Sequence, residues 1–293
     1  MAGKEDSGVH GLAPGPQPGM RFSVLNNESE MNIAKSKDGT RLAYDVSGQG
    51  PALVYVTGAT CFRRFFPIVK DAKIFAEKFK VYTYDRRGRG DSEDTQPYSL
   101  EREIEDLEAI IDAAGGSAFV YGHSSGAVLA LEAALRIPHK VAKVFLYDAA
   151  YLHREEEREQ YTGLEREVSS LLRQSKNGQA VKRFLIGIGM PKAFAYLIPL
   201  MPGWKQIKGL APTLMYDIAL TRDLPPLDRA KQVKIPIQIT YGEKSPESMH
   251  GVSNQLANAI AGSILCRVPK QDHMVDAKIL LPILSEFFER RAS

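Results

Sequence analysis

The sequence predicts an α/β fold in which helices flank a mostly parallel central sheet and a helical cap is inserted late in the chain. Three observations indicate this fold. Strand-like and helix-like runs alternate after Asn32, the turn at 122–126 joins one such strand to a helix, and the alternation stops between Tyr147 and Ile235. Alternating strands and helices build a parallel sheet with helices on its faces. The chain has 293 residues, 44% of them hydrophobic, which is enough to bury one sizeable core.

Individual elements follow from the composition of each run. Short apolar runs bounded by glycine, proline or polar residues are typical of buried strands, and longer runs with helical periodicity are typical of helices. Strands are expected at 42–46, 52–57, 81–84, 119–121, 141–147, 235–241 and 264–268. Helices are expected at 100–114, 127–135 and 279–288.

The interruption of this pattern divides the chain into three predicted parts. The core is expected to comprise residues 32–148 and 234–293, and the helical cap is expected to comprise residues 149–233. An interruption of this length is too long for a loop in a compact domain. Residues 1–31 are predicted to be a disordered leader, because the segment 7–19 contains four glycines and three prolines and few apolar residues.

The predicted cap begins with charged helical sequence and continues with a stretch rich in methionine and aromatic residues, which prolines interrupt. Two compatible interpretations stay open. These side chains form a small core of the cap itself, or they line an apolar pocket over the turn at 122–126. The residues concerned are Phe184, Met190, Phe194, Tyr196, Met201, Trp204, Met215 and Tyr216.

Composition and charge argue against several classes of function. A net charge of +3, from 38 basic and 35 acidic residues, provides no basic stripe of the kind that binds nucleic acid. The amino terminus shows no signal-peptide pattern and no run approaches about 18 apolar residues, so neither secretion by a standard signal nor a membrane span is expected. Cys61 and Cys266 lack the spacing of a zinc site or a disulfide framework, which favours reduced thiols in the cytoplasm.

The segment Gly122-His123-Ser124-Ser125-Gly126 indicates a nucleophilic serine. A Gly-x-Ser-x-Gly sequence between a strand and a helix can form a strained corner that exposes the serine hydroxyl, because the glycines add no Cβ where the chain packs closely. The following helix directs its free N–H groups at that corner, where a negative oxygen forms during acyl transfer. We therefore predict that Ser124 is a nucleophile.

A serine nucleophile needs a base, and His273 is the best candidate among the six histidines. It follows the strand expected at 264–268 by a short loop and precedes the final helix, which is a suitable order and position after Ser124. His123 lies within the turn itself, where its neighbouring position directs it away from the hydroxyl of Ser124.

Three motifs together resemble the α/β-hydrolase superfamily. They are the turn at 122–126, the late loop of His273, and the segment 85–92, whose sequence Asp-Arg-Arg-Gly-Arg-Gly-Asp-Ser is similar to a D-x-R-G-x-G-x-S turn of that family. The resemblance spans residues 32–147 and 235–290 but not the cap, which varies freely in the superfamily. It implies an α/β-hydrolase fold in which Arg87 and Asp85 brace loops near the active site.

The catalytic acid departs from the common pattern of the superfamily. Many members place an aspartate three residues after the glycine that ends the strand beyond the cap, but this sequence has Ser245 there. A variant of the family takes the acid from the end of the strand after the nucleophile helix, and that strand here ends at Asp148. Neighbouring parallel strands lie about 5 Å apart, so Asp148 can reach His273. We predict Asp148 as the acid and Glu247 as the reserve, whereas Asp272 is expected to point elsewhere.

The resemblance also implies an oxyanion hole. Its donors are expected to be the backbone N–H of Ser125 and that of Ala59, in the loop after the strand 52–57. Family members usually have a histidine and a glycine before the second donor, whereas this loop reads Thr57-Gly58-Ala59-Thr60. A backbone donor does not depend on that histidine, so the mechanism is retained. Cys61 is expected to be a packed loop residue.

Together these residues predict a serine hydrolase that cleaves a carboxylic ester or lactone of an apolar, moderately sized molecule through an acyl-enzyme on Ser124. Lactone hydrolases and small esterases of the superfamily also take their acid from this earlier strand. A serine at this position argues against haloalkane dehalogenases and epoxide hydrolases, which use a carboxylate nucleophile. A small-molecule substrate is the expected partner, and no cofactor or metal is expected. The alternatives are a ligand-binding protein with negligible turnover and a biosynthetic enzyme for cyclisation or carbon–carbon bond cleavage.

Overall fold

Eight strands form one sheet in this computed structural model, which describes Met1 and residues 31–290. The strands lie in the order β1-β2-β4-β3-β5-β6-β7-β8. Their bounds are β1 (Asn32–Lys35), β2 (Arg41–Ser47), β3 (Ala52–Val56), β4 (Lys80–Tyr84), β5 (Ala118–His123), β6 (Val141–Tyr147), β7 (Ile237–Gly242) and β8 (Ile264–Val268). Pairing is antiparallel between β1 and β2 and between β2 and β4, and parallel across the other pairs, which confirms the predicted fold class. Except for its two end residues, the predicted disordered leader lies outside the described residues.

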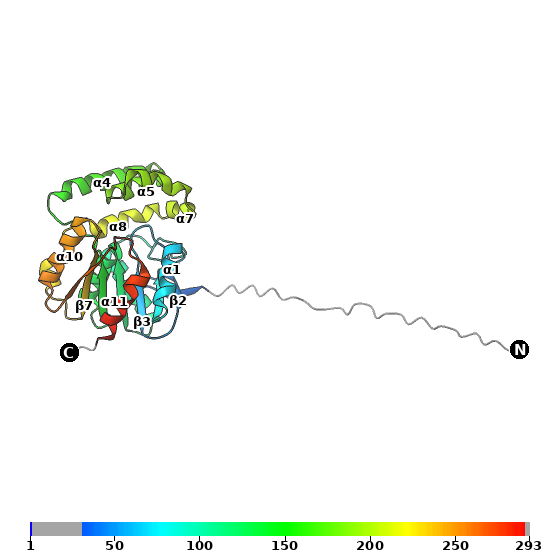
Figure 1. The fold of residues 1–293 in the computed structure, drawn as a ribbon. Helices are drawn as coiled ribbons and strands as arrows, with labels where there is room; N and C mark the ends of the chain where they lie inside the picture. Colours follow the sequence, from blue (N-terminus) through cyan, green and yellow to red (C-terminus); the bar gives the residue numbers. More distant parts are fainter. Residues whose placement is uncertain (2–30, 291–293) are drawn as a thin grey trace. The chain divides into compact units, whose positions relative to one another are not determined.

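Helices cover both faces of this sheet (Figure 1). They are α1 (Phe66–Phe75), α2 (Leu100–Ala113), α3 (Ser125–Arg136), α10 (Glu247–Ala259) and α11 (Ala277–Glu289). In β3, Val54 and Val56 belong to an apolar cluster shared with α2, α3 and α10, whereas Leu53 and Tyr55 belong to a cluster shared with α1 and α11. Successive side chains of a strand point to opposite faces, so the central strands are buried on both sides.

The chain between β6 and β7 forms helices, as the sequence predicts for the cap. These are α4 (Glu157–Arg173), α5 (Asn177–Gly187), α6 (Lys192–Leu197), α7 (Trp204–Gly209), α8 (Leu214–Thr221) and α9 (Leu227–Ala230). Figure 1 shows α4 and α5 on the side of α8 that faces away from the sheet. Among residues 31–290, no helix has both the length and the apolar character needed to cross a membrane. The division into core and cap at 148/149 and 233/234 remains a prediction.

The cap has an apolar core of its own. Phe184 is buried in it, and Trp204 and Met215 pack against it, which agrees with the first of the two interpretations of these aromatic and methionine residues. Ala59 and Phe65, from the segment between β3 and α1, also pack against this core. The cap therefore rests on the loop in which the second oxyanion donor is predicted.

Candidate active site

The strand β5 ends in a sharp turn at Ser124, and α3 begins at the next residue. Ser124 has a φ of 58° and a ψ of −123°, a backbone conformation that is strained for any residue with a side chain. Its N–H donates to the carbonyl of Tyr147 at 3.0 Å, and its carbonyl accepts from the N–H of Ala127 at 2.9 Å. These bonds hold a strained serine on a strand-to-helix corner, which is the geometry of a nucleophile elbow.

Close packing explains the two glycines of the turn. A Cβ on Gly122 would lie 2.5 Å from the carbonyl oxygen of Gly126, and a Cβ on Gly126 would lie 2.1 Å from the carbonyl oxygen of Val56. Both obstacles are backbone atoms, which cannot rotate aside as a side chain can. The predicted close approach at these glycines is therefore confirmed, and it lets the start of α3 pack directly against β3.

The register of the sheet brings the ends of three strands together. His123 pairs with Tyr147, and Tyr147 pairs with Thr240, so Ser124 and Asp148 both follow directly after neighbouring strand ends. The N–H of Asp148 donates to the carbonyl of Thr240 at 2.9 Å. The carboxyl ends of parallel strands are where open α/β sheets form their sites.

Asp148 lies against His273. Its carboxylate is fully buried, and Oδ2 is 3.0 Å from Nδ1 of the histidine. Because a carboxylate only accepts hydrogen bonds, this contact assigns the proton to Nδ1 and leaves the lone pair on Nε2. Asp148 also has a positive φ of 47°, so it shares the strained backbone of Ser124. The structure thus brings together the two residues that the sequence predicts as base and acid.

Two further donors hold the carboxylate of Asp148. The hydroxyl of Ser245 donates to Oδ2 at 2.5 Å, and the N–H of Gly242 donates to Oδ1 at 3.3 Å. Ser245, at the position where an acid is common in the superfamily, therefore supports Asp148, the predicted acid at the end of the neighbouring strand. The reserve acid, Glu247, has a side chain that is 88% exposed and lies 3.7 Å from Arg154. Glu247 is therefore a surface residue and not a partner of the predicted base.

Neighbouring side chains fix the loop that carries His273. Nε2 of His123 lies 2.8 Å from the carbonyl oxygen of His273, and the two imidazole rings are 4.7 Å apart. The hydroxyl of Tyr147 donates to the carbonyl of Asp272 at 2.7 Å. The carboxylate of Asp272 accepts from the N–H of Met274 at 2.8 Å, within the loop itself. His123, which the sequence predicts to turn away from Ser124, thus anchors the loop of the base.

His123 is expected to make the stability of the fold depend on pH. Burial, together with the neighbouring His273, lowers the pKa of His123 below its ordinary value. Below about pH 6.5 the unfolded chain then binds more protons than the folded chain, so the free energy of unfolding falls as the pH falls. Urea titrations at about pH 7.5 and about pH 5 should show a smaller pH dependence for His123→Gln than for the wild type. An equal dependence in both proteins would contradict this assignment.

The predicted oxyanion donors come from two segments next to Ser124. Ser125 is the first residue of α3, so its N–H has no acceptor within the helix. Gly58 precedes Ala59, and a Cβ built on Gly58 would lie 3.5 Å from the hydroxyl oxygen of Ser124. The loop of Ala59 therefore passes beside the serine hydroxyl. The carbonyl of Ala59 accepts from the hydroxyl of Thr60 at 2.7 Å.

A buried ionic network that the sequence analysis missed contacts both donor segments. Its centre is Asp217 on cap helix α8. Oδ1 of Asp217 accepts from the hydroxyl of Ser125 at 2.8 Å and from Nη1 of Arg86 at 2.9 Å. Nη2 of Arg89 donates to Oδ1 at 2.9 Å and to Oδ2 at 2.8 Å. A carboxylate of the cap thus binds the first residue of α3, whose N–H is a predicted oxyanion donor.

The same network reaches the other donor segment. Nη1 of Arg89 donates to the carbonyl of Gly58 at 2.7 Å, and Arg86 pairs bidentately with Glu103 of α2. Burial alone would raise the pKa of Asp217, but Arg89, Arg86 and the hydroxyl of Ser125 outweigh it and lower the pKa. Two buried cations therefore face two buried carboxylates, and the carboxylate of Asp217 stays ionised at neutral pH.

One signal in the sequence could have identified Asp217. It is the only acidic residue between Glu167 and Asp223, and it lies within the apolar run 214–220. A lone charge in an apolar helix is costly to bury unless it is paired, so it indicates a buried partner. The partners themselves come from the segment 85–92, where the sequence analysis singled out only Arg87 and Asp85.

Arg87 and Asp85 do brace loops, as predicted. Arg87 pairs bidentately with Asp106 of α2, with both bonds at 2.7 Å. Asp85 accepts from the N–H of Arg63 at 2.6 Å, in the loop that follows Ala59. The other two arginines of the segment, Arg86 and Arg89, lie closer to the site, because they donate hydrogen bonds to Asp217.

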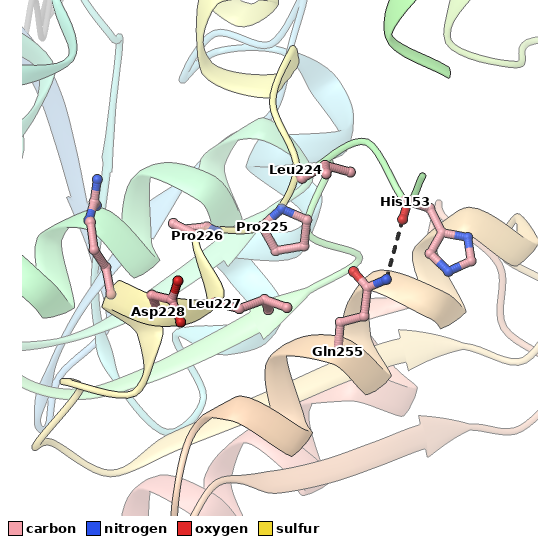
Figure 2. Close-up of a pocket in the computed structure, with 8 residues that line it drawn as sticks. His153, Leu224, Pro225, Pro226, Leu227, Asp228 and Gln255 are labelled. Atoms are coloured by element: carbon pink, nitrogen blue, oxygen red, sulfur yellow. Dashed lines mark hydrogen bonds between the residues drawn. The ribbon is translucent and has the colours of Figure 1, made fainter. Parts of the chain in front are cut away.

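A separate pocket lies where the two connections between cap and core meet α10 (Figure 2). It has a volume of about 440 Å³ and is lined by His153, residues 224–229 and Gln255. The side-chain amide of Gln255 donates to the carbonyl of His153 at 3.3 Å. None of the predicted catalytic residues lines this pocket, so it is distinct from the candidate active site.

Cys61 lies in the same loop as the predicted donor Ala59. Burial raises the pKa of the Cys61 thiol to about 11, so its thiolate does not form near neutral pH. This fits the prediction that Cys61 is a packed residue and not a second nucleophile. Within residues 31–290, no group of three or more histidine, cysteine, aspartate or glutamate side chains is arranged to hold a metal ion.

Solved structures share this architecture. An alpha/beta hydrolase from Sphaerobacter thermophilus superposes with a TM-score of 0.79 at 35% identity, covering 88% of this chain and 100% of that chain. The enol-lactonase from Burkholderia xenovorans has a TM-score of 0.68 at 18% identity, covering 88% of this chain and 100% of that chain. At 18% identity the likeness to the enol-lactonase shows the fold alone.

Sequence comparison reaches the same family. The curated hydrolase YraK of Bacillus subtilis is 33% identical over 107 residues, which are 35% of this chain and 39% of that protein, so the match spans less than half of its length. The model of the alpha/beta hydrolase family matches residues 34–275, a range that includes both Ser124 and His273. The chain therefore belongs to the alpha/beta hydrolase family, as its motifs predict.

Proposed function

We propose that the chain is a serine hydrolase that cleaves a carboxylic ester or lactone of an apolar, moderately sized molecule. The observation that carries this proposal is the 3.0 Å contact between His273 and the buried Asp148, beside a serine in strained backbone at the adjacent strand end. A serine beside a base that a buried acid orients is the arrangement used for acyl transfer.

In the proposed reaction, the hydroxyl of Ser124 attacks the substrate carbonyl while Nε2 of His273 accepts its proton. Asp148 keeps the imidazole in the required tautomer and stabilises the imidazolium that forms. The N–H groups of Ala59 and Ser125 donate to the oxyanion of the tetrahedral intermediate. His273 then returns the proton to the leaving alcohol, and water releases the acyl group from Ser124 by the same steps.

The apolar character of the substrate is proposed from the cap. Its apolar core packs against Ala59 and Phe65, next to the loop that passes beside Ser124. Esters and lactones are uncharged at the reacting carbonyl, so they suit an apolar site with a few fixed donors. A lactone would open by the same steps, with its alcohol remaining attached to the acyl group. We also propose a cytoplasmic location, which the free thiols of Cys61 and Cys266 support.

A fluorophosphonate probe combined with intact mass spectrometry tests this proposal. The wild type should gain one adduct, peptide mapping should place it on Ser124, and Ser124→Ala should gain none. Ser263→Ala, which changes a serine in the turn before β8, serves as the matched control and should be labelled normally. The labelled protein should lose its hydrolysis of short aryl esters and γ-lactones.

The same experiment separates the alternative functions. Absence of both labelling and turnover would contradict the hydrolase proposal and favour a ligand-binding protein. Labelling of Ser124 without hydrolysis of any ester or lactone would favour cyclisation or carbon–carbon bond cleavage with the same residues.

A further inference from the structure

One segment of the cap exposes an unusual concentration of apolar side chains. Of the thirteen large hydrophobic residues exposed among those described, six lie between residues 188 and 201: Ile188, Phe194, Tyr196, Leu197, Leu200 and Met201. We call these six residues the apolar face of the cap. The exposed fractions reach 82% at Leu200 and 64% at Tyr196. Single exposed apolar residues are common on protein surfaces, but clustered ones mark contact with a partner or a membrane.

The apolar face lies within a long stretch of the chain that carries positive charge and no acidic residue except Asp217 at its end. Residues 168–216 contain no aspartate or glutamate and seven cations, Arg173, Lys176, Lys182, Arg183, Lys192, Lys205 and Lys208. The five lysines of this set form no ion pair with a carboxylate among the described residues, whereas Arg183 pairs with Glu167. The charge of residues 168–216 is therefore one-sided, whereas the net charge of the whole chain is only +3.

Lys182 connects the apolar face with neighbouring lysines of the cap. Nζ of Lys182 lies over the ring of Tyr196, 5.1 Å from its centroid. Lys182 also lines a recess of about 550 Å³ together with Lys176, Lys208, Pro199 and Trp204. Positive charge and exposed apolar side chains are therefore mixed over the same part of the cap. Lysine, tyrosine and tryptophan with exposed leucine and phenylalanine are typical of segments that lie in a membrane interface.

We propose that the apolar face of the cap docks on the surface of a membrane that contains anionic lipids. The exposed side chains would enter the boundary between headgroups and acyl chains, and the surrounding lysines would lie against the anionic headgroups. A second copy of this chain fits less well, because a symmetric contact would bring two acid-free cationic surfaces together. The apolar core of the cap is formed by other residues, and the described part of the chain leaves much of these six side chains uncovered.

Vesicle co-sedimentation tests this proposal and needs no catalysis. The wild type should sediment with vesicles of phosphatidylcholine and phosphatidylglycerol, should bind phosphatidylcholine alone much less, and should be released as salt increases. Tyr196→Ser/Leu200→Ser tests the apolar contact, and Lys192→Glu/Lys205→Glu tests the charge. Each double variant should lower partitioning to the anionic vesicles by about tenfold or more.

Matched variants elsewhere on the surface serve as controls. Leu265→Ser changes an exposed leucine on β8, and Lys78→Glu/Lys244→Glu makes the same change of charge outside the cap. Both should bind anionic vesicles as the wild type does, and thermal midpoints should confirm that all variants fold. Failure of the wild type to bind anionic vesicles, or equal binding by the apolar-face variants, would overturn the proposal. Light scattering that shows a wild-type dimer converted to monomers by Tyr196→Ser/Leu200→Ser would assign the face to a second copy instead.

Discussion

Replacement of Asp148 by asparagine is expected to lower kcat for ester hydrolysis by about 10⁴-fold, because it reverses the tautomer of the base. Three donors converge on this carboxylate, the hydroxyl of Ser245, the N–H of Gly242 and Nδ1 of His273. An asparagine must place its NH₂ group either toward Gly242 or toward Ser245 and His273. The backbone N–H of Gly242 cannot become an acceptor, whereas the other two groups can. The NH₂ group therefore faces His273, which moves its proton to Nε2 and can no longer accept one from Ser124.

The control for this prediction is Glu247→Gln, which changes the reserve acid in the same chemical way. Its side chain is 88% exposed, so this variant should keep nearly all of the activity. The measurement is kcat and kcat/KM for an aryl ester, with circular dichroism to confirm the fold of each protein. Loss of activity by orders of magnitude in Glu247→Gln alone would transfer the role of acid to Glu247.

The sequence predicts most accurately those strands whose side chains are buried on both faces of the sheet. The strand Val141–Tyr147 was predicted to the residue, because its residues 144–147 form an apolar run that is buried on both faces of the sheet. The strand Asn32–Lys35 was missed, since it has four residues, lies at the edge of the sheet and contains one buried residue. The helix Phe66–Phe75 was also missed. It follows Phe65, which provides no side-chain cap, so Pro67 in the first turn has no capping residue before it to reinforce the signal for the start of a helix.

The candidate site also contains residues that could be predicted from the sequence and residues that could not. Ser124 and His273 lie in short motifs whose local context indicates their position, and Asp148 could be placed from the end of its strand. The network around Asp217 could not be placed, because its bonds join residues that are 92 positions apart for Ser125 and 131 apart for Arg86. Such contacts depend on how the cap docks on the core, and the cap is the part that no motif covers. Asp217, the only acidic residue between Glu167 and Asp223, was the one visible sign of them.

Replacement of Asp217 by alanine is expected to destabilise the fold by about 3–5 kcal/mol, because it leaves buried positive charge without a partner. Arg86 would keep Glu103, but Arg89 would keep only backbone carbonyls, those of Gly58 and Cys61, as hydrogen-bond acceptors among the described residues. The hydroxyl of Ser125 would also lose its acceptor. Chemical denaturation should show this loss as a lower midpoint with an unchanged slope.

A double variant separates the effect on stability from the effect on catalysis. Arg89→Met/Asp217→Leu removes one charge of each sign, so it should recover most of the lost stability. It should still lower kcat by about tenfold to a hundredfold with little change in KM, because Ser125 and Gly58 lose the groups that position the two oxyanion donors. Arg87→Met/Asp106→Leu removes a buried pair from the same segment without touching either donor, and should keep its activity. If Arg89→Met/Asp217→Leu regained full kcat together with its stability, the network would hold the cap in place without positioning the oxyanion hole.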